Sequence, residues 1–379
     1  MKRIFSLMLT AAVLVGALAG CGGSAQPSTL PSTSAAAAPS EASEAPETTA
    51  PAIEPALRQF TDDAGRTVTL PAELTRVAVS GPLTQMYLLP LCGEKLVGFA
   101  RTDAMEQKYL SAQLEGLPEL GQLYGGKGTM DLEALLASGA QAVIDVGEAK
   151  DSIAEDFDAL TAQTGIPFLH LEATVSSSAE AYRRLGELLG CEDRAEELAA
   201  YCERTLAETN AIMEQVDADG ARKTILYCLG DKGVNVLAEK SFHAETLSLV
   251  AKNVADLQEV VSKGTGNEVD LEQILLWDPE VLLFAPDSCY DSVLTDPAWQ
   301  SLQAVQSGSV YETPCGPYGW LASPPSVQRF LGMQWLCALL YPEYVSYDLQ
   351  ERVTEYYELF YGFTLEDSAY QELTEHAMP

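Results

Sequence analysis

The stretch MDLEALL at residues 130–136, followed by AQAVIDV at 140–146, decides the fold because it occurs a second time. Residues 269–275 read VDLEQIL and residues 279–285 read PEVLLFA, so the unit returns after 139 residues (Asp131 to Asp270) without a gap. Each copy predicts a short helix with apolar residues at helical spacing and then a buried strand. Asp131 and Asp270 are good N-caps for these helices. A helix–strand unit that is repeated in the sequence without a gap indicates two related lobes.

The segments before each copy support this interpretation. Residues 76–79 read RVAV and precede Gly81-Pro82 and a predicted helix over 83–91. Residues 223–227 read KTILY and precede a turn at 230–233 and a helix that begins near Ser241. Strands that alternate with helices are typical of parallel sheets. We therefore expect an α/β protein of two lobes with mostly parallel sheets.

A long helical stretch lies between the lobes. Apolar or small residues recur every three or four positions from Ala195 to Met213, Asp193 can cap the helix, and a shorter helix precedes it within 176–189. A helix of ~20 residues is ~30 Å long, which is about one domain diameter. We expect a single long rigid helix that joins the lobes; the alternative is a helix that lies on one lobe.

The N-terminus predicts export and anchoring. Lys2 and Arg3 precede an apolar run over 4–18, and LAGC at 18–21 resembles the lipobox of bacterial lipoproteins. The resemblance implies a signal peptide over residues 1–20 and a lipidated, palmitate-bearing Cys21; the alternative is an ordinary signal peptide with an incidental cysteine. The following residues are rich in Ala, Pro, Ser, Thr and Glu, so we expect a disordered tether over 21–57. The predicted location is extracytoplasmic, anchored to the cell membrane by lipid alone.

The composition of the chain excludes some kinds of binding site and argues against others. The formal net charge of −33 excludes binding of nucleic acid or anionic lipid through a basic patch. Seven cysteines besides Cys21 form no CxxC pair, which argues against a disulfide framework, and three histidines argue against a multi-histidine metal site. We divide the body into an N-terminal lobe over 58–175, an interlobe helix region over 176–215 and a C-terminal lobe with terminal helices over 216–379.

Three further segments carry a resemblance to a known family. They are FTDDAGRTVTLP at 60–71, SFHAETLSLVAKNV at 241–254 and PPSVQRFLGMQWL at 324–336. Their order resembles the substrate-binding proteins of ABC importers for iron-siderophores, haem and cobalamin, although Ala251-Lys252 stand where that family usually has glycines. The resemblance implies two α/β lobes joined by a rigid helix, with a ligand cleft between the lobes.

The resemblance also implies a partner, an ABC permease dimer with its ATPase, to which a monomeric binding protein delivers its ligand. One exposed carboxylate on each lobe docks on the permease in that family, and Glu133 and Glu272 occupy the matching position. The alternative is that each glutamate only favours the dipole at a helix N-terminus.

Ligands of such sheets lie beyond the carboxyl ends of the strands, which selects a set of candidate residues. The candidates for ligand binding are Gln85, Arg101, Tyr124, Lys127, Phe242, His243, Tyr318, Trp320 and Arg329. The loop PCGPYGW at 314–320 either presents its aromatic rings to a flat ligand or buries them in the core. The cations either meet ligand carboxylates or form structural salt bridges. His243 and Tyr124 are axial ligands only if the ligand is haem.

We therefore expect a binding protein that captures an iron-siderophore-type metal chelate, with corrinoid or haem as the nearest alternatives. A ligand sensor for a membrane kinase is a further alternative. An enzyme is disfavoured because no nucleophile–base pair or cysteine cluster appears, and no resident cofactor or metal is expected.

Overall fold

The chain opens with a β-hairpin formed by β1 (Leu57–Thr61) and β2 (Thr67–Pro71). The two strands pair antiparallel, with Thr61 opposite Thr67, and Gly65 supplies the positive φ of 76° that the turn needs. The hairpin contains residues 60–71, one of the three segments that carry the family resemblance. In this computed structural model the described residues are 56–102, 104–124, 129–261, 263–286 and 288–379.

The first sheet belongs to the N-terminal lobe and is fully parallel. Its order is β3 (Val77–Val79), β4 (Ala142–Gly147) and β5 (Phe168–Glu172), and the strands are almost entirely buried. The connections carry α1 (Pro82–Cys92), the 3₁₀ turn η1 (Gly93–Lys95), α2 (Ala104–Leu114), α3 (Leu132–Ser138) and α4 (Ile153–Thr164). Buried, near-continuous apolar strands are typical of a parallel sheet covered by helices.

The second sheet belongs to the C-terminal lobe and is mixed. Its strands run in the order β11 (Val310–Glu312), β10 (Val281–Phe284), β6 (Thr224–Leu229), β7 (Asn235–Val236) and β9 (Asn267–Glu268), while β8 (Lys252–Asn253) also pairs with β6. The β6, β8, β10 and β11 pairings are parallel, whereas β7 and β9 pair antiparallel. The helical segments of this lobe are η2 (Phe242–Ala244), α7 (Glu245–Val250), α8 (Leu271–Trp277), α9 (Tyr290–Val293) and α10 (Gln303–Ser307).

The repeated unit is a structural repeat. The two copies form α3 with β4 and α8 with β10. Asp131 caps α3 by accepting a hydrogen bond from the Ala134 N–H at 2.9 Å, and Asp270 caps α8 through the Gln273 N–H at 2.8 Å. The capping predicted from sequence is therefore confirmed at both positions.

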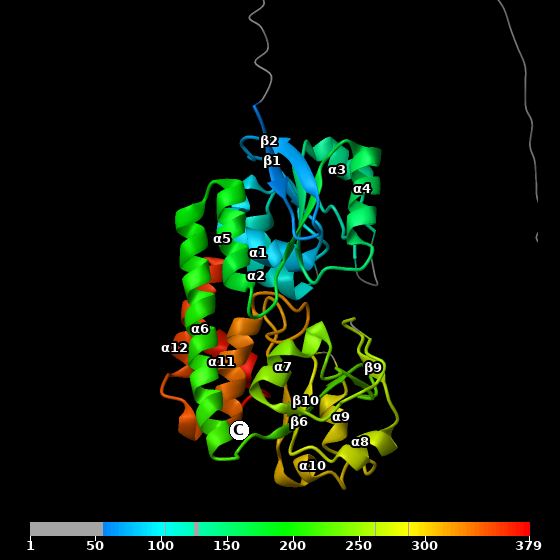
Figure 1. Cartoon of the computed structure of the whole chain (residues 1–379). Helices are drawn as coiled ribbons and strands as arrows, with labels where there is room; N and C mark the ends of the chain where they lie inside the picture. The colour runs from blue at the N-terminus through cyan, green and yellow to red at the C-terminus, as the bar shows by residue number, and fades with distance from the viewer. Residues whose placement is uncertain (1–55, 103, 125–128, 262, 287) are drawn as a thin grey trace, which may run out of the picture. The chain divides into compact units, whose positions relative to one another are not determined.

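A long helix runs beside both sheets. Helix α6 (Glu192–Ala218) has 27 residues and packs against α5 (Ser178–Leu189), as Figure 1 shows. At 1.5 Å per residue it is about 40 Å long, enough to accompany both lobes. Cys191 occupies the N-cap, so the helix begins slightly before the cap predicted at Asp193.

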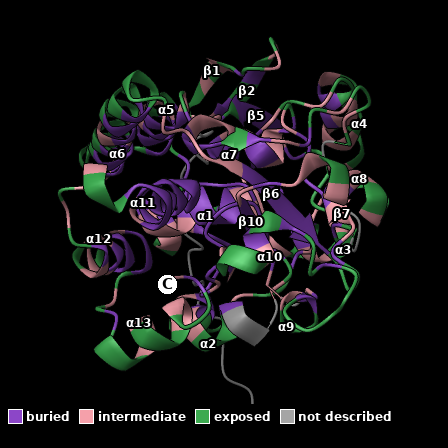
Figure 2. Cartoon of the chain, turned by 90° about the horizontal axis from the view of Figure 1, so that it is seen from below, coloured by how far each residue is buried: buried purple, intermediate pink, exposed green. Residues whose placement is uncertain are grey.

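The C-terminal helices close the core against α6 and α1. They are α11 (Arg329–Leu340), the 3₁₀ turn η3 (Pro342–Tyr344), α12 (Leu349–Tyr356), the π-helical turn η4 (Tyr357–Tyr361) and α13 (Asp367–Thr374). Helix α11 is buried along nearly its whole length, as its colour in Figure 2 shows. The Tyr201 hydroxyl of α6 donates to Gln334 of α11, and Phe360 of η4 packs on Tyr182 of α5. The terminal helices therefore pack against helices of both lobes and not only against the second sheet.

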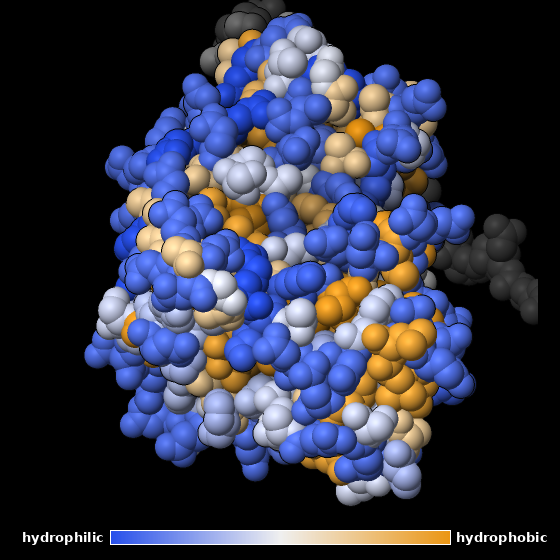
Figure 3. Space-filling model, turned by 60° about the horizontal axis from the view of Figure 1, so that its bottom comes forward, coloured by the Kyte–Doolittle hydropathy of each residue, from blue (hydrophilic) through white to orange (hydrophobic). Residues whose placement is uncertain are grey.

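Hydrophilic side chains cover most of the face in Figure 3. Among the described residues, no helix combines the length and the apolar character needed to cross a membrane.

Candidate functional site

Polar side chains follow the strands of the first sheet at the edge where the strands end. Glu148 comes directly after β4, Glu172 ends β5, and Thr174 lies shortly beyond it. Because these strands are parallel, their carboxyl ends meet at one edge of the sheet. This edge supplies one wall of a pocket.

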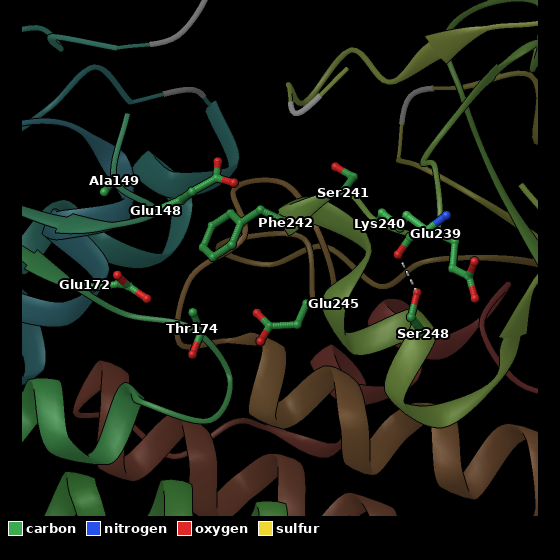
Figure 4. A pocket seen from close by; sticks show the side chains of 10 residues that line it. All are labelled: Glu148, Ala149, Glu172, Thr174, Glu239, Lys240, Ser241, Phe242, Glu245 and Ser248. Carbon is green, nitrogen blue, oxygen red and sulfur yellow. Dashed lines mark hydrogen bonds between the residues drawn. The ribbon is translucent and has the colours of Figure 1, made fainter. Parts of the chain in front are cut away.

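The second lobe supplies the opposite wall through residues 239–248, which include η2 and the start of α7. The pocket holds about 480 Å³. Figure 4 shows residues of the first sheet on one side and residues 239–248 on the other, with the Phe242 ring between them. The lining residues are Glu148, Ala149, Glu172, Thr174, Glu239, Lys240, Ser241, Phe242, Glu245 and Ser248.

A buried arginine fixes the aromatic wall of this pocket. The Arg329 side chain is 1% exposed, and its guanidinium lies 4.6 Å from the centre of the Phe242 ring. The same group donates to Glu245 Oε2 at 2.8 Å and to the Phe242 carbonyl at 3.3 Å. A cation–π contact and a charge-assisted hydrogen bond therefore hold Phe242 and Glu245 in place.

Glu245 also connects the two walls. Its Oε1 accepts a hydrogen bond from the Val175 N–H at 3.0 Å, and Val175 lies in the segment after β5. One carboxylate is thus bonded to the backbone of the first lobe and to Arg329 of α11. This arrangement makes Glu245 a fixed part of the pocket floor rather than a freely rotating surface acid.

His243 stands beside the pocket in its neutral form. Its Nδ1 donates to the Ala322 carbonyl at 3.2 Å, and its ring meets Phe242 edge to face. Burial lowers the pKa of His243, against an opposing effect of the hydrogen bond to Ala322 and of Glu148. With Nδ1 protonated, Nε2 carries the lone pair and is the atom that could ligate a metal.

Three residues predicted to bind ligand are instead parts of the core. Gln85, Tyr318 and Trp320 are buried, and none of them lines the pocket. Gln85 donates to the Tyr318 hydroxyl at 3.1 Å and accepts from the Ala100 N–H at 2.8 Å. For the loop at 314–320, the structure shows the second alternative, in which the aromatic rings are buried. Burying the rings under α11 and against Tyr361 lowers the free energy, because it removes their apolar surface from water.

Two further predicted residues, Tyr124 and Arg101, lie outside the pocket lining. Tyr124 donates to Asp156 Oδ2 at 3.2 Å, and burial together with Asp156 raises the pKa of its hydroxyl. Arg101 is exposed on the segment before α2. Lys127 lies outside the described residues, as does Cys21. Of the predicted ligand-binding set, Phe242 is the one member in the described lining.

Several lining residues were missed by sequence reasoning. Glu148 directly follows β4 and Glu172 is the last residue of β5, so the strand-end rule could have found them. Glu245 carried no such signal, because its role depends on contacts with Val175 and Arg329, 70 and 84 residues away.

A buried polar network beside the first sheet has the residue types of a hydrolase triad without its geometry. Asp145 accepts hydrogen bonds from Ser80 and from His170 Nδ1, the latter at 2.7 Å. Ser80 therefore meets the carboxylate and a Thr84 hydroxyl, not the imidazole. A nucleophile needs a base within hydrogen-bond reach, so this set orders strand ends instead.

A second depression lies at the start of α12. It holds about 520 Å³ and is lined by Asp348, Gln350, Glu351, Thr354, Glu355 and Glu358. All these residues belong to α12, its cap and the turn that continues it, so the depression does not draw on both lobes.

The predicted docking residues lie on the repeated helices. Glu133 and Glu272 are exposed in the first turns of α3 and α8. Each helix also exposes a leucine close to its glutamate: Leu136 is 52% exposed and Leu276 is 79% exposed. Residues three or four apart share a helix face, so each lobe presents a carboxylate beside an apolar group.

Two α/β lobes, a long accompanying helix and a pocket lined from both lobes define the class of extracytoplasmic solute-binding proteins. A family model described as periplasmic binding protein matches residues 85–315, and the chain belongs to this family. The prediction of a binding protein rather than an enzyme agrees with this membership.

Individual proteins resemble this chain over different shares of its length. The chain is 29% identical to a solved ABC transporter solute-binding protein from Sulfurospirillum deleyianum, with a TM-score of 0.76, covering 84% of this chain and 99% of that one. A molybdate-bound MolA from Haemophilus influenzae shares the fold at 20% identity and a TM-score of 0.63, covering 82% and 99%. The Fe(3+)-citrate-binding protein YfmC of Bacillus subtilis is 24% identical over 144 residues, which span 37% of this chain and 44% of that protein.

Proposed function

We propose that this protein is the lipid-anchored solute-binding component of an ABC importer and that it captures an iron-siderophore-type metal chelate. The observation that carries the proposal is the pocket of about 480 Å³ lined by strand ends of one lobe and by residues 239–248 of the other. Pockets of several hundred Å³ with one aromatic wall and several polar groups suit compact organic ligands. The iron-citrate relative supports a ferric chelate as the cargo.

The delivery step needs a partner at the membrane. We assign the exposed Glu133 and Glu272 to docking on the two halves of a permease dimer, since one acid per lobe suits a two-fold partner. Lipidation of Cys21 keeps the protein close to that permease and raises its local concentration without a permanent complex.

Titration of the full chain, purified in detergent, with ferric trihydroxamate, ferric citrate, haemin and cyanocobalamin tests the cargo through tryptophan fluorescence. A ferric chelate should bind at micromolar concentration or tighter, and Phe242→Ala should weaken that binding at least tenfold. Phe60→Ala, which removes a half-buried ring from β1, is the matched control and should bind normally.

Absence of binding by all four compounds at high micromolar concentration would contradict the chelate proposal. Preference for haemin or cyanocobalamin would replace the ferric chelate with those ligands. The anchor is tested separately: Cys21→Ala should move the protein from the membrane fraction to the soluble fraction, and an unchanged distribution would contradict lipidation.

A further inference from the structure

We infer that the pocket selects chelates that are neutral or positively charged and rejects anionic ones. The inference rests on the proposed function, because it specifies the ligand class of the same pocket. It is argued from the ion pairs and hydrogen bonds that each charged group of the lining makes.

Acids outnumber bases among the lining residues. Four glutamates face one lysine: Glu148, Glu172, Glu239 and Glu245 against Lys240. Lys240 pairs with Asp256 at 2.9 Å, and Glu148 pairs with Lys150 at 2.8 Å. Within the described residues, Glu172 and Glu239 have no ion-pair partner within 4 Å. The lining therefore keeps an excess of negative charge.

The buried cation next to the pocket is committed to the protein. Arg329 is nearly fully buried, and its guanidinium nitrogens bond Glu245, the Phe242 carbonyl and the Ser326 carbonyl. An anionic ligand would have to displace Glu245 from this buried pair, which would leave a carboxylate unpaired. The arginine thus positions Phe242 instead of receiving a ligand anion.

The histidine adds no positive charge. His243 is half-buried, its Nδ1 is bonded to the Ala322 carbonyl, and burial keeps its pKa below the usual range. The charged groups that act on it are Glu148, Lys150 and Arg329. At neutral pH the imidazole is therefore uncharged beside the excess of carboxylates.

The charge of a ferric chelate follows from its donor groups. Three singly charged hydroxamates balance a ferric ion, and an alkylammonium tail then makes the complex a cation. Three doubly charged catecholates leave a trianion, and ferric citrate complexes are also anionic. Like charges held close to one another repel, whereas an ammonium group gains from Glu172 and Glu239. The pocket should therefore prefer a hydroxamate chelate to ferric citrate, although one relative is named for the latter.

The test compares three ferric probes on the full chain in detergent, by fluorescence titration at low and high salt. The probes are a linear trihydroxamate with a free amine, the same compound acetylated at that amine, and a tricatecholate. The free amine should bind roughly tenfold more tightly than its acetylated form, with the difference shrinking at high salt, and the tricatecholate should bind weakest. The double variant Glu172→Gln/Glu239→Gln should lose the amine preference, and Glu187→Gln, an exposed acid of α5, should keep it.

Equal binding of the free and acetylated amines, or tighter binding of the tricatecholate, would overturn the charge inference while leaving chelate capture in place. Retention of the amine preference in the double variant would also overturn it. Binding of none of the three probes would overturn the proposed function and this inference together.

Discussion

The two copies of the repeated unit, α3 with β4 and α8 with β10, each form a capped helix followed by a buried strand, with different side chains inside. Gln141 and Glu280 stand at matching positions, and each accepts hydrogen bonds from the backbone at the start of the neighbouring strand, at Thr75 and Thr224 respectively. Further along the strand, the first lobe buries Asp145 with His170, whereas the second buries Phe284 against Trp299. The repeat therefore preserves caps and strand starts, while each core is filled independently.

The largest expected effect concerns the exposed glutamate that each copy carries in the first turn of its helix. Charge reversal of both Glu133 and Glu272 should abolish uptake of the ferric chelate in cells, because each lobe would then repel its half of the permease. The purified double variant should bind the chelate with unchanged affinity. Reversal of Glu187 is the control and should leave uptake normal. Normal uptake by the double variant, or loss of chelate affinity, would remove docking from the account.

The next largest effect is on stability, and it compares the buried residues at the matching positions Asp145 and Phe284. Phe284→Ala should lower the free energy of unfolding by about 3–5 kcal/mol, because it leaves a cavity beside Trp299 and Tyr290. Asp145→Ala should cost about 2 kcal/mol, since Ser80 and His170 lose a buried acceptor. Urea unfolding of the full chain measures both. A larger cost at Asp145 than at Phe284 would show that the polar core is the more tightly coupled one.

A smaller effect is expected at the ends of the two helices. Gly139 ends α3 at φ 68° and Asp278 ends α8 at φ 40°, so both are left-handed. Gly139→Ala should cost about 1 kcal/mol from this conformation, since its new Cβ would meet Arg76 only at ordinary contact distance. Asp278→Gly should stay within about 0.5 kcal/mol, because relief of the strain offsets the lost hydrogen bond from the Gln303 N–H. Urea unfolding measures both variants, and equal costs would contradict this distinction.

The smallest effect distinguishes the carboxylate of Glu280 from the amide of Gln141. Burial raises the pKa of Glu280, but hydrogen bonds from Thr224 and Lys223 outweigh it and hold that pKa below its usual range. Because the folded-state pKa is lowered, the stabilisation is present above the usual glutamate pKa and is lost as the pH falls through the folded value. Glu280→Gln should therefore cost about 0.5 kcal/mol at neutral pH, a small value because water screens the partly exposed pair with Lys223, and less in acid.

The first lobe supplies the control for this pH dependence. The Gln141 amide does not titrate, so the cost of Gln141→Ala should be the same at neutral and acid pH once the shared acid sensitivity of the fold is subtracted. Urea unfolding of both variants and the unchanged protein across this pH range makes the comparison. A cost of Glu280→Gln that does not change with pH would contradict the lowered pKa.

Sequence reasoning reached the fold because the fold depends on local patterns. The caps at Asp131 and Asp270 and the long helix α6 each follow from residues close together in the chain. The pocket depends on distant contacts instead: Arg329 reaches Phe242 across 87 residues, and Glu245 reaches Val175 across 70. Periodicity says which residues are apolar, but it does not say which loop closes over which helix. For this reason the sequence left two alternatives open for Tyr318 and Trp320, and the structure shows the buried one.

We propose that the metal chelate binds between the two lobes, at the wall formed by Phe242 and Glu245. Anomalous diffraction at the iron edge from co-crystals with the amine-bearing ferric trihydroxamate tests it most directly. One strong iron peak is expected in the pocket between Glu148 and Phe242. An iron peak in the acidic depression of α12, or elsewhere on the surface with that pocket empty, would contradict it.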